Sequence, residues 1–269
     1  MMREKLGILL LAALVFSSVG FKNYVWFMSI GYGLAVAAMG AVLLMEGVTG
    51  SLQLTAGFVV LCVLLLGYGL RLSGFLIHRE RKSAAYRKTL EKVSKTQSGK
   101  PMPLVAKLGL WVSVCLLYTA EVSPVLFRGM NGNGSWAVSA LIALVGLIME
   151  AVADWQKSAY KKTDPHSPAM KGLYKLVRCP NYLGEMIFWT GIWVSGFHVN
   201  ATASQWVVST AGYLLILYVM FSGARRLEAR QNRNYGDRSD YREYCEHTPI
   251  LLPFIPLYHL SKDLKHERG

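Results

Sequence analysis

Long apolar runs, separated by short polar or basic segments, are the feature of this chain that most restricts its fold. Seven runs approach the roughly 20 apolar residues that an α-helix needs to cross a bilayer. We therefore expect an all-α fold, a polytopic membrane protein with about seven transmembrane helices, in which the whole chain, 1–269, forms a single membrane domain. The expected spans cover residues 6–20, 25–45, 53–77, 104–127, 136–153, 183–199 and 204–222.

The first run follows Arg3 and Lys5, as the apolar part of a signal peptide would. It lacks a clear cleavage site of the small-x-small type, so we interpret it as a span.

Basic residues gather after the third and fifth spans and in the C-terminal tail, whereas 47–52 and 196–204 contain no lysine or arginine. The positive-inside rule then places the basic loops and the C-terminus in the cytoplasm and the N-terminus outside, with Arg3 and Lys5 as a mild contradiction. The loop 83–101 is expected to be flexible. The net charge of +13 is explained by anionic membrane lipids as partners, so no nucleic-acid partner is expected.

The four cysteines, at positions 62, 115, 179 and 245, show no CxxC spacing or paired pattern. Neither a disulfide framework nor a metal site is predicted.

A polar turn, from Gly172 to Glu185, stands directly before the sixth span. Pro180 disfavours helix at the residue before it, and Asn181 is a good N-cap, so a helix is expected to begin here. A helix start offers free N–H groups and a positive dipole end to a phosphate or carboxylate.

Four charged residues at the end of the fifth span, Glu150, Asp154, Lys157 and Lys161, are spaced to share one face of a helix. One interpretation is a solvated helix end with i,i+4 pairs. The other is a ligand-facing row whose carboxylates bind a ribose, an amide or an amine.

The tail between Arg225 and Tyr244 interleaves arginines with tyrosines. Such a pattern can clamp phosphates and stack on a purine. It is equally typical of an amphipathic tail that binds lipid headgroups.

Three motifs in this order resemble the C-terminal domain family of the steroid 5α-reductases, and within it a branch of bacterial membrane proteins of unassigned function. The similarity covers roughly residues 140–256, and Arg71-Leu-Ser-Gly-Phe-Leu-Ile-His-Arg79 extends it faintly into the third span. The motifs are Glu150-xxx-Asp154, then Gly172-Leu-Tyr with Pro180-Asn-Tyr-Leu-Gly-Glu185, then Tyr241-Arg-Glu-Tyr244 with Leu-Pro253-Phe.

The resemblance implies a seven-helix protein that holds NADPH in a cytoplasm-facing cavity and reduces a double bond conjugated to a carbonyl in a lipophilic substrate. The expected location is a bacterial inner membrane. By position, Asp154 matches a cofactor-contacting aspartate, Asn181 and Glu185 match the family turn, and Glu150 replaces an asparagine. Lys161 falls near a phosphate-contacting arginine. The cofactor-binding residues implied in this way are Glu150, Asp154, Lys161, Arg178, Asn181, Tyr182, Glu185, Arg226, Arg230, Tyr241 and Tyr244, with Arg233 as a further candidate in the tail.

The chain departs from the family pattern in two places. Cys179 stands where many bacterial relatives have histidine, and no counterpart is found for the glutamate of span two or the tyrosine of span three that protonate the substrate in steroid enzymes. Glu121 and Tyr118, in the fourth span, are therefore the expected catalytic acids, with Tyr32 and Tyr68 as further phenols. Desolvation favours the neutral, proton-donating form of Glu121, although a buried structural hydrogen bond would also explain it.

Three functions remain open on the sequence alone. The leading hypothesis is an integral-membrane NADPH-dependent reductase. The second hypothesis is an S-adenosylmethionine-dependent membrane methyltransferase, a class with a similar Arg-x-Pro-x-Tyr turn and a tail that ends in proline. A non-catalytic lipid-binding membrane protein is the third.

Overall fold

The computed structural model describes residues 2–94, 102–132 and 134–260, and within them the chain is helical, without strands. Six helices in this described part of the chain are long and apolar enough to cross a membrane. They correspond to the first five expected spans and the last one. The membrane-length helices are α1 (Met2–Ser17, continued by the 3-10 turn η1, Ser18–Phe21), α2 (Ile30–Val48), α3 (Ala56–Lys82), α5 (Leu104–Asn131), α6 (Ala137–Thr163) and α8 (Ala203–Tyr235).

The expected sixth span, 183–199, is a shorter helix, α7 (Pro180–Val194), of 15 residues. At 1.5 Å per residue it measures about 22 Å, less than the roughly 30 Å of a bilayer core. The chain leaves the helix at Ser195 and Gly196, where the next residues form turns. The span expected at 183–199, and with it the total of seven spans, therefore stays a prediction.

Two other local predictions need correction. The second span was expected from residue 25, but Tyr24–Met28 form a 3-10 turn, η2, capped by the Asn23 side chain, and α2 begins only at Ile30. The segment 83–101 was expected to be a flexible loop, yet α4 (Ala84–Val93) forms there because the Ser83 hydroxyl caps the Tyr86 amide. The rest of that segment, 95–101, lies outside the described residues.

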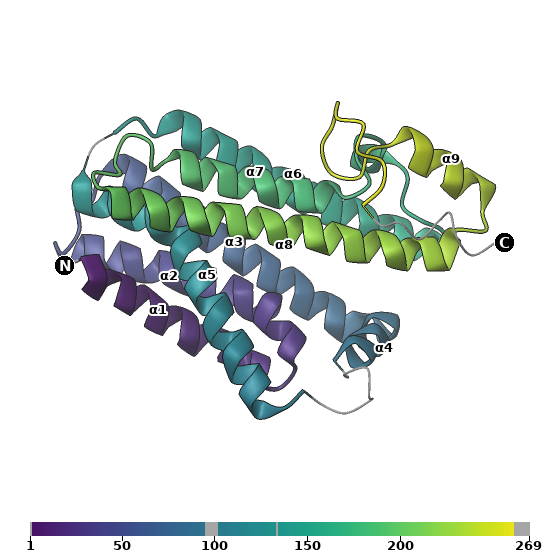
Figure 1. The fold of residues 1–269 in the computed structure, drawn as a ribbon, viewed down its shortest axis with the longest axis horizontal. Helices are drawn as coiled ribbons and strands as arrows, with labels where there is room; N and C mark the ends of the chain where they lie inside the picture. Colours follow the sequence, from purple (N-terminus) through teal and green to yellow (C-terminus); the bar gives the residue numbers. More distant parts are fainter. Residues whose placement is uncertain (1, 95–101, 133, 261–269) are drawn as a thin grey trace. The chain divides into compact units, whose positions relative to one another are not determined.

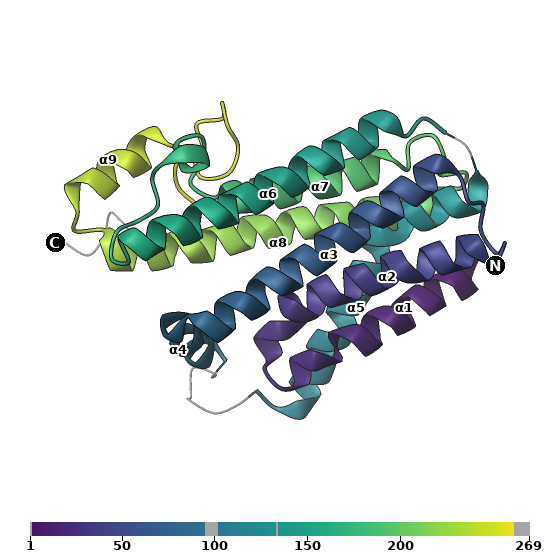
Figure 2. The same cartoon turned by 180° about the vertical axis from the view of Figure 1, so that it is seen from behind.

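The chain divides into two compact units, each built from two stretches of sequence. Unit 1 is Met1–Leu141 with Gly191–Tyr213, and unit 2 is Ile142–Thr190 with Leu214–Gly269. In unit 1, α2 packs against α1 and α3, and α5 contacts all three, as Figures 1 and 2 both show.

The interior of unit 1 contains polar side chains as well as apolar ones. Arg128, in α5, is fully buried and donates to the carbonyl oxygens of Gly134, Ser135 and Ser195 at 2.9, 3.0 and 2.9 Å. These bonds satisfy carbonyl groups of loops that would otherwise lack partners in the interior.

Unit 2 holds most of α6 and α7, the second part of α8, the 3-10 turn η3 (Gly172–Lys175), and α9 (Ser239–His247). The unit 2 parts of α6, α7 and α8 run side by side in Figures 1 and 2. The Tyr241 hydroxyl of α9 donates to Asn232 Oδ1 of α8 at 2.8 Å, which fixes α9 against the end of that helix.

Candidate functional site

The helices α6 and α7 meet backbone to backbone at two glycines. A Cβ atom on Gly184 would lie 2.6 Å from the Glu150 nitrogen, and one on Gly146 would lie 2.3 Å from the Phe188 nitrogen. Only glycine permits so close an approach. The contact therefore brings the polar end of α6 alongside the first turns of α7.

Four of the predicted cofactor-binding residues are distributed over this helix pair. Glu150 and Asp154 on α6 and Glu185 on α7 are 3%, 9% and 6% exposed. The carbonyl oxygen of Asn181, Oδ1, is buried and has no hydrogen-bond partner among the described residues. A buried carbonyl without a donor is unfavourable by about 1–3 kcal/mol, so the geometry calls for a donor from a bound molecule or from water.

Asn181 does not cap the helix, contrary to the prediction. The helix begins at Pro180, and the Cys179 carbonyl accepts the first bond, from the Leu183 amide, at 3.1 Å. Proline is favoured at the first helical position because its φ angle already suits the helix and it has no N–H to leave unsatisfied. Asn181 is thus inside the first turn, where its side chain is available for other contacts.

The loop before α7 is held by backbone bonds to the chain that follows α9. The amides of Arg178 and Cys179 donate to the carbonyls of Pro249 and Ile250, each at 2.9 Å. Burial raises the pKa of the Cys179 thiol to about 12, although Lys157 and Arg178 act in the opposite direction. The thiol is therefore protonated and unreactive at neutral pH.

The Gly172-Leu-Tyr motif forms the turn η3. Gly172 has a φ of +65°, and a Cβ atom there would meet Gln156 Oε1 at 2.5 Å. That same oxygen accepts the Leu173 amide at 2.9 Å. The motif thus docks the loop onto α6, because glycine alone combines this φ angle with this contact.

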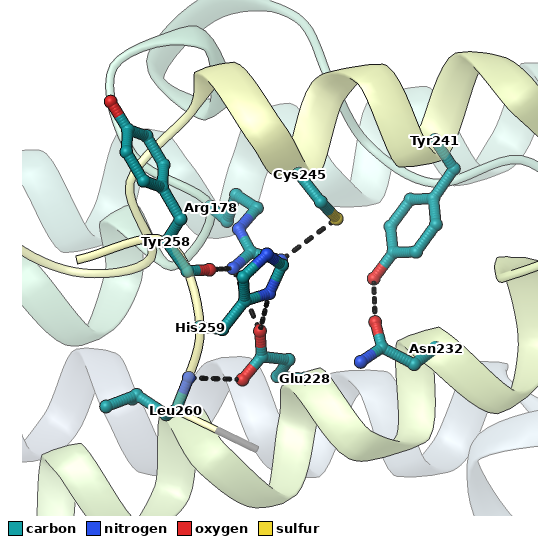
Figure 3. Close-up of polar contacts among 8 residues, drawn as sticks. All are labelled: Arg178, Glu228, Asn232, Tyr241, Cys245, Tyr258, His259 and Leu260. Carbon is teal, nitrogen blue, oxygen red and sulfur yellow. Dashed lines mark hydrogen bonds and ion pairs between the residues drawn. The ribbon is translucent and has the colours of Figure 1, made fainter. Parts of the chain in front are cut away.

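Arg178 lies in a buried network that joins the loop before α7 to α8, α9 and the tail (Figure 3). Its Nη2 pairs with Glu228 Oε1 of α8 at 3.0 Å, and its Nη1 donates to Cys245 Sγ of α9 at 3.0 Å. Nη2 also donates to the carbonyl oxygen of Tyr258. The Nε atom is buried and has no partner within the described chain.

Glu228, the partner of Arg178 in this network, also binds two residues of the C-terminal tail. Its Oε2 accepts the Leu260 amide at 2.8 Å, and its Oε1 lies 3.2 Å from His259 Nδ1 (Figure 3). Burial alone would lower the pKa of Arg178, but the neighbouring Cys245 and Glu228 raise it, so the guanidinium stays charged. The tail residues 258–260 are in this way fastened to a buried ion pair.

Lys161 extends from the last turns of α6. Its ammonium donates to the carbonyls of Pro165 and Ser167 at 3.0 and 2.6 Å and to the Tyr235 hydroxyl at 2.9 Å. An ammonium group has three N–H donors, so each of them already has an acceptor.

Two tail tyrosines predicted at the site have internal partners. Tyr241 bonds to Asn232, and the Tyr244 hydroxyl donates to the Tyr174 carbonyl at 2.5 Å. Burial raises the pKa of both phenols, which therefore remain neutral. The Tyr241 hydroxyl thus fixes α9 to α8, and the Tyr244 hydroxyl fixes it to η3.

Tyr182, Arg226 and Arg230 come together at the α7–α8 contact. The Tyr182 ring lies over Gly223, about one turn before Arg226 on α8. Tyr182 interacts electrostatically with Glu185 and with both arginines. Arg226 and Arg230 are exposed, so their guanidinium groups are accessible to an anion.

The two expected catalytic acids belong to unit 1 and are both 3% exposed. The Tyr118 hydroxyl donates to the Phe27 carbonyl at 2.9 Å, and its ring packs against Tyr32, with 4.7 Å between the centroids. Glu121 lies one turn further along α5. Pro124 leaves the Ala120 carbonyl without its helical donor, and the Ser123 hydroxyl replaces it at 2.8 Å.

Sequence reasoning did not single out Glu228, Cys245 or His259. Glu228 carried a signal: it is the one carboxylate among the arginines at positions 225, 226, 230 and 233 near the end of an apolar helix. A lone acid in that setting needs a cationic partner. Cys245 and His259 belong to no recognisable sequence pattern, because their contacts with Arg178 and Glu228 form only when the C-terminal tail folds back onto α8.

No group of three His, Cys, Asp or Glu side chains in residues 2–94, 102–132 and 134–260 is arranged to hold a metal ion. A comparison with proteins of curated function finds no match. A family model described as "Protein of unknown function (DUF1295)" matches residues 15–248, a stretch that includes α2 to α9 and every predicted site residue. With most of its length matched, the chain belongs to this DUF1295 family.

Proposed function

We propose that this protein is an integral-membrane NADPH-dependent reductase of a conjugated double bond in a lipophilic, steroid- or isoprenoid-like substrate. The observation that carries the proposal is the buried Asn181 carbonyl, which has no hydrogen-bond partner among the described residues, on a helix pair that also bears Glu150, Asp154 and Glu185. The resemblance of these motifs to the steroid 5α-reductases gives the class of reaction.

The residues present fit a nicotinamide nucleotide. The carboxamide of nicotinamide has two N–H donors, which suit the Asn181 oxygen and a neighbouring carboxylate. Ribose hydroxyls donate well to carboxylates such as Glu150 and Asp154. When bound, NADPH would supply the hydride of the reduction.

The phosphate groups need cations with free donors. Arg226 and Arg230 are exposed beside Tyr182, and guanidinium groups bind phosphates in a bidentate manner. The three donors of Lys161 already have acceptors in the described chain, so a phosphate would have to replace one of them. Arg178, Tyr241 and Tyr244 would act by holding the loop and α9 in position.

The reduction also needs a proton donor for the developing enolate. Glu121 and Tyr118 remain our candidates, with Tyr68, which donates to Tyr32 at 3.1 Å, as a further phenol. We infer seven spans with α7 as the short one, the N-terminus outside, and the cofactor residues and C-terminus facing the cytoplasm of a bacterial inner membrane. The cluster of lysines in the last turns of α6 and in the loop after it supports this orientation.

A thermal-shift titration of the detergent-purified protein tests the proposal, with NADPH, NADH and S-adenosylmethionine compared side by side. At 100 times its Kd, a ligand that binds only the folded state stabilises it by about 2.7 kcal/mol. We expect a raised transition with NADPH that is lost in Asn181→Ala and kept in Asn234→Ala, a matched change at an exposed position of α8. A shift with S-adenosylmethionine alone would replace the reductase with a methyltransferase.

A further inference from the structure

A cavity of about 370 Å³ opens in unit 2 where α6 ends and η3 begins. Its size lies in the range of roughly 300–1,000 Å³ that is usual for ligand pockets. Most of its lining is apolar or aromatic. The lining residues are Trp155, Gln156, Ala159, Tyr160, Thr163, Ala169, Lys171, Gly172 and Tyr174.

The cavity is separate from the proposed cofactor residues. At 100° per residue, the positions 155, 156, 159 and 163 lie on the opposite side of α6 from 150, 154, 157 and 161, and 160 lies at the edge between the two sides. A molecule in the cavity would therefore not compete with one held by Glu150 and Asp154.

An apolar stripe on α6 leads directly into the cavity. Val145, Ile148, Val152 and Trp155 are all exposed, with Trp155 at 69%. They follow helical spacing, and the next positions of the same stripe, 159 and 163, line the cavity. Since α6 is one of the membrane-length helices, this stripe is suited to face acyl chains, and the cavity lies at its end.

The rim of the cavity is cationic. Lys171 is exposed, and its ammonium lies 5.9 Å from the centroid of the Tyr160 ring. The segment 155–176 contains five lysines and a single acidic residue, Asp164. Hydrogen bonding to Ser167 and the charge of Arg238 lower the pKa of Asp164, so this carboxylate already has a cationic neighbour in Arg238.

We propose that this cavity binds the headgroup of an anionic phospholipid of the surrounding bilayer. Lys171 would contact the phosphate, Tyr160 and Tyr174 would surround the glycerol, and an acyl chain would lie along the stripe that ends at Trp155. Tryptophan is typical of the depth at which headgroups meet acyl chains, and each basic residue near an anionic membrane surface strengthens lipid binding.

Retention of lipid by the purified full chain tests this proposal. Native mass spectrometry would compare phosphatidylglycerol with phosphatidylcholine, each added from mixed micelles, for the wild type and for Lys171→Gln. We expect Lys171→Gln to weaken phosphatidylglycerol binding about fivefold. Lys175 is an exposed lysine of η3 that does not line the cavity, so Lys175→Gln should change the affinity for phosphatidylglycerol by less than twofold.

A second variant fills the cavity without a change in charge. Ala159→Phe is expected to reduce the binding of phosphatidylglycerol to the level of Lys171→Gln, with the unfolding temperature of the lipid-free protein serving as the folding control. Equal losses for Lys171→Gln and Lys175→Gln, or equal binding of both lipids by the wild type, would overturn the site.

Two further outcomes would also overturn the site. Inorganic phosphate at millimolar concentration should not displace the lipid; if it does so completely, the cavity is an anion site rather than a lipid site. If Trp155→Ser lowers the oligomeric mass instead of lipid retention, the stripe is an interface between copies of this chain.

Discussion

Arg178 and Glu228 form an ion pair, with 3.0 Å between Nη2 and Oε1, in which the side chains are only 2% and 0% exposed. It connects the loop before α7 with α8, elements 50 residues apart in sequence. The partners differ in what else they hold: Arg178 reaches Cys245 of α9, and Glu228 reaches the tail. The pair thus determines how four elements, the loop, α8, α9 and the tail, meet beside the proposed cofactor residues.

Breaking this pair should be strongly destabilising. Glu228→Gln leaves a buried guanidinium without its counter-charge, and the loss of one partner of a buried pair is usually about 3–5 kcal/mol. We expect a reduction of that size in the free energy of unfolding, measured by denaturant titration in detergent with tryptophan fluorescence as the signal.

The exposed pair between Arg238 and Asp240 is the control. Its side chains are 40% and 49% exposed, so Asp240→Asn should change the free energy of unfolding by no more than about 1 kcal/mol. Similar losses for the two variants would show that burial does not determine the strength of the Arg178–Glu228 pair.

The contacts of the tail predict where the chain can be shortened. Truncation after Leu257 removes the Tyr258 carbonyl from Arg178 and the Leu260 amide from Glu228. Each buried polar group left without a partner is unfavourable by about 1–3 kcal/mol, so a lower unfolding temperature is expected. Truncation after Leu260 keeps these contacts and should unfold as the full chain does; equal unfolding temperatures for the two truncations would contradict the role of the tail.

The sequence predicted helices well and their polar connections poorly. Apolar runs of membrane length identified α3 and α6, because burial in lipid constrains every residue of a span. The turn η2, which delays the start of α2, and the helix α4 were missed, since each is capped by one side chain, Asn23 or Ser83. Such local hydrogen bonds leave little trace in hydropathy.

For the candidate site, helical spacing grouped Glu150 with Asp154, and both are buried on α6, whereas their role as cofactor ligands stays a prediction. Spacing along one helix could not reveal the Gly146 and Gly184 contact that sets α6 against α7. It also gave no sign that Arg178 forms an ion pair with Glu228, because the loop before α7 and the helix α8 meet only in the folded protein.

Deprotonation of the Cys179 thiol should contribute to the unfolding of the protein at alkaline pH. The pKa of its thiol is raised from 9.0 to about 12 in the folded state, so the folded protein holds a proton that the unfolded chain loses first. This contribution to stability is fully present below about pH 9 and is lost as pH rises toward 12. We expect the unfolding temperature of the wild type to fall over this window.

The Cys179→Ala variant isolates that contribution. Its unfolding temperature should fall less steeply between pH 9 and 11 than that of the wild type, whereas the two slopes should agree between pH 7 and 8. The phenols of Tyr241 and Tyr244, whose pKa values burial also raises, keep part of the alkaline dependence in the variant. Identical slopes above pH 9 would exclude the Cys179 thiol as a titrating group.

The contact at Gly184 links stability to the proposed cofactor site. In Gly184→Ala, the new methyl group would lie 2.6 Å from the Glu150 nitrogen and 2.9 Å from the Gly146 carbonyl, both backbone atoms that cannot rotate away. Overpacking of this kind destabilises by about 1–3 kcal/mol. Gly74→Ala, in α3, meets nothing within 4 Å and serves as the control, with no loss expected.

To relieve the contact, α6 and α7 must move apart, which separates Glu150 and Asp154 from Asn181 and Glu185. If these four side chains bind one molecule, Gly184→Ala should also weaken the NADPH-dependent thermal shift under conditions in which the protein is still folded, and Gly74→Ala should not. A destabilised variant with an undiminished NADPH shift would mean that the two helices do not hold the cofactor between them, even though their glycines pack them together.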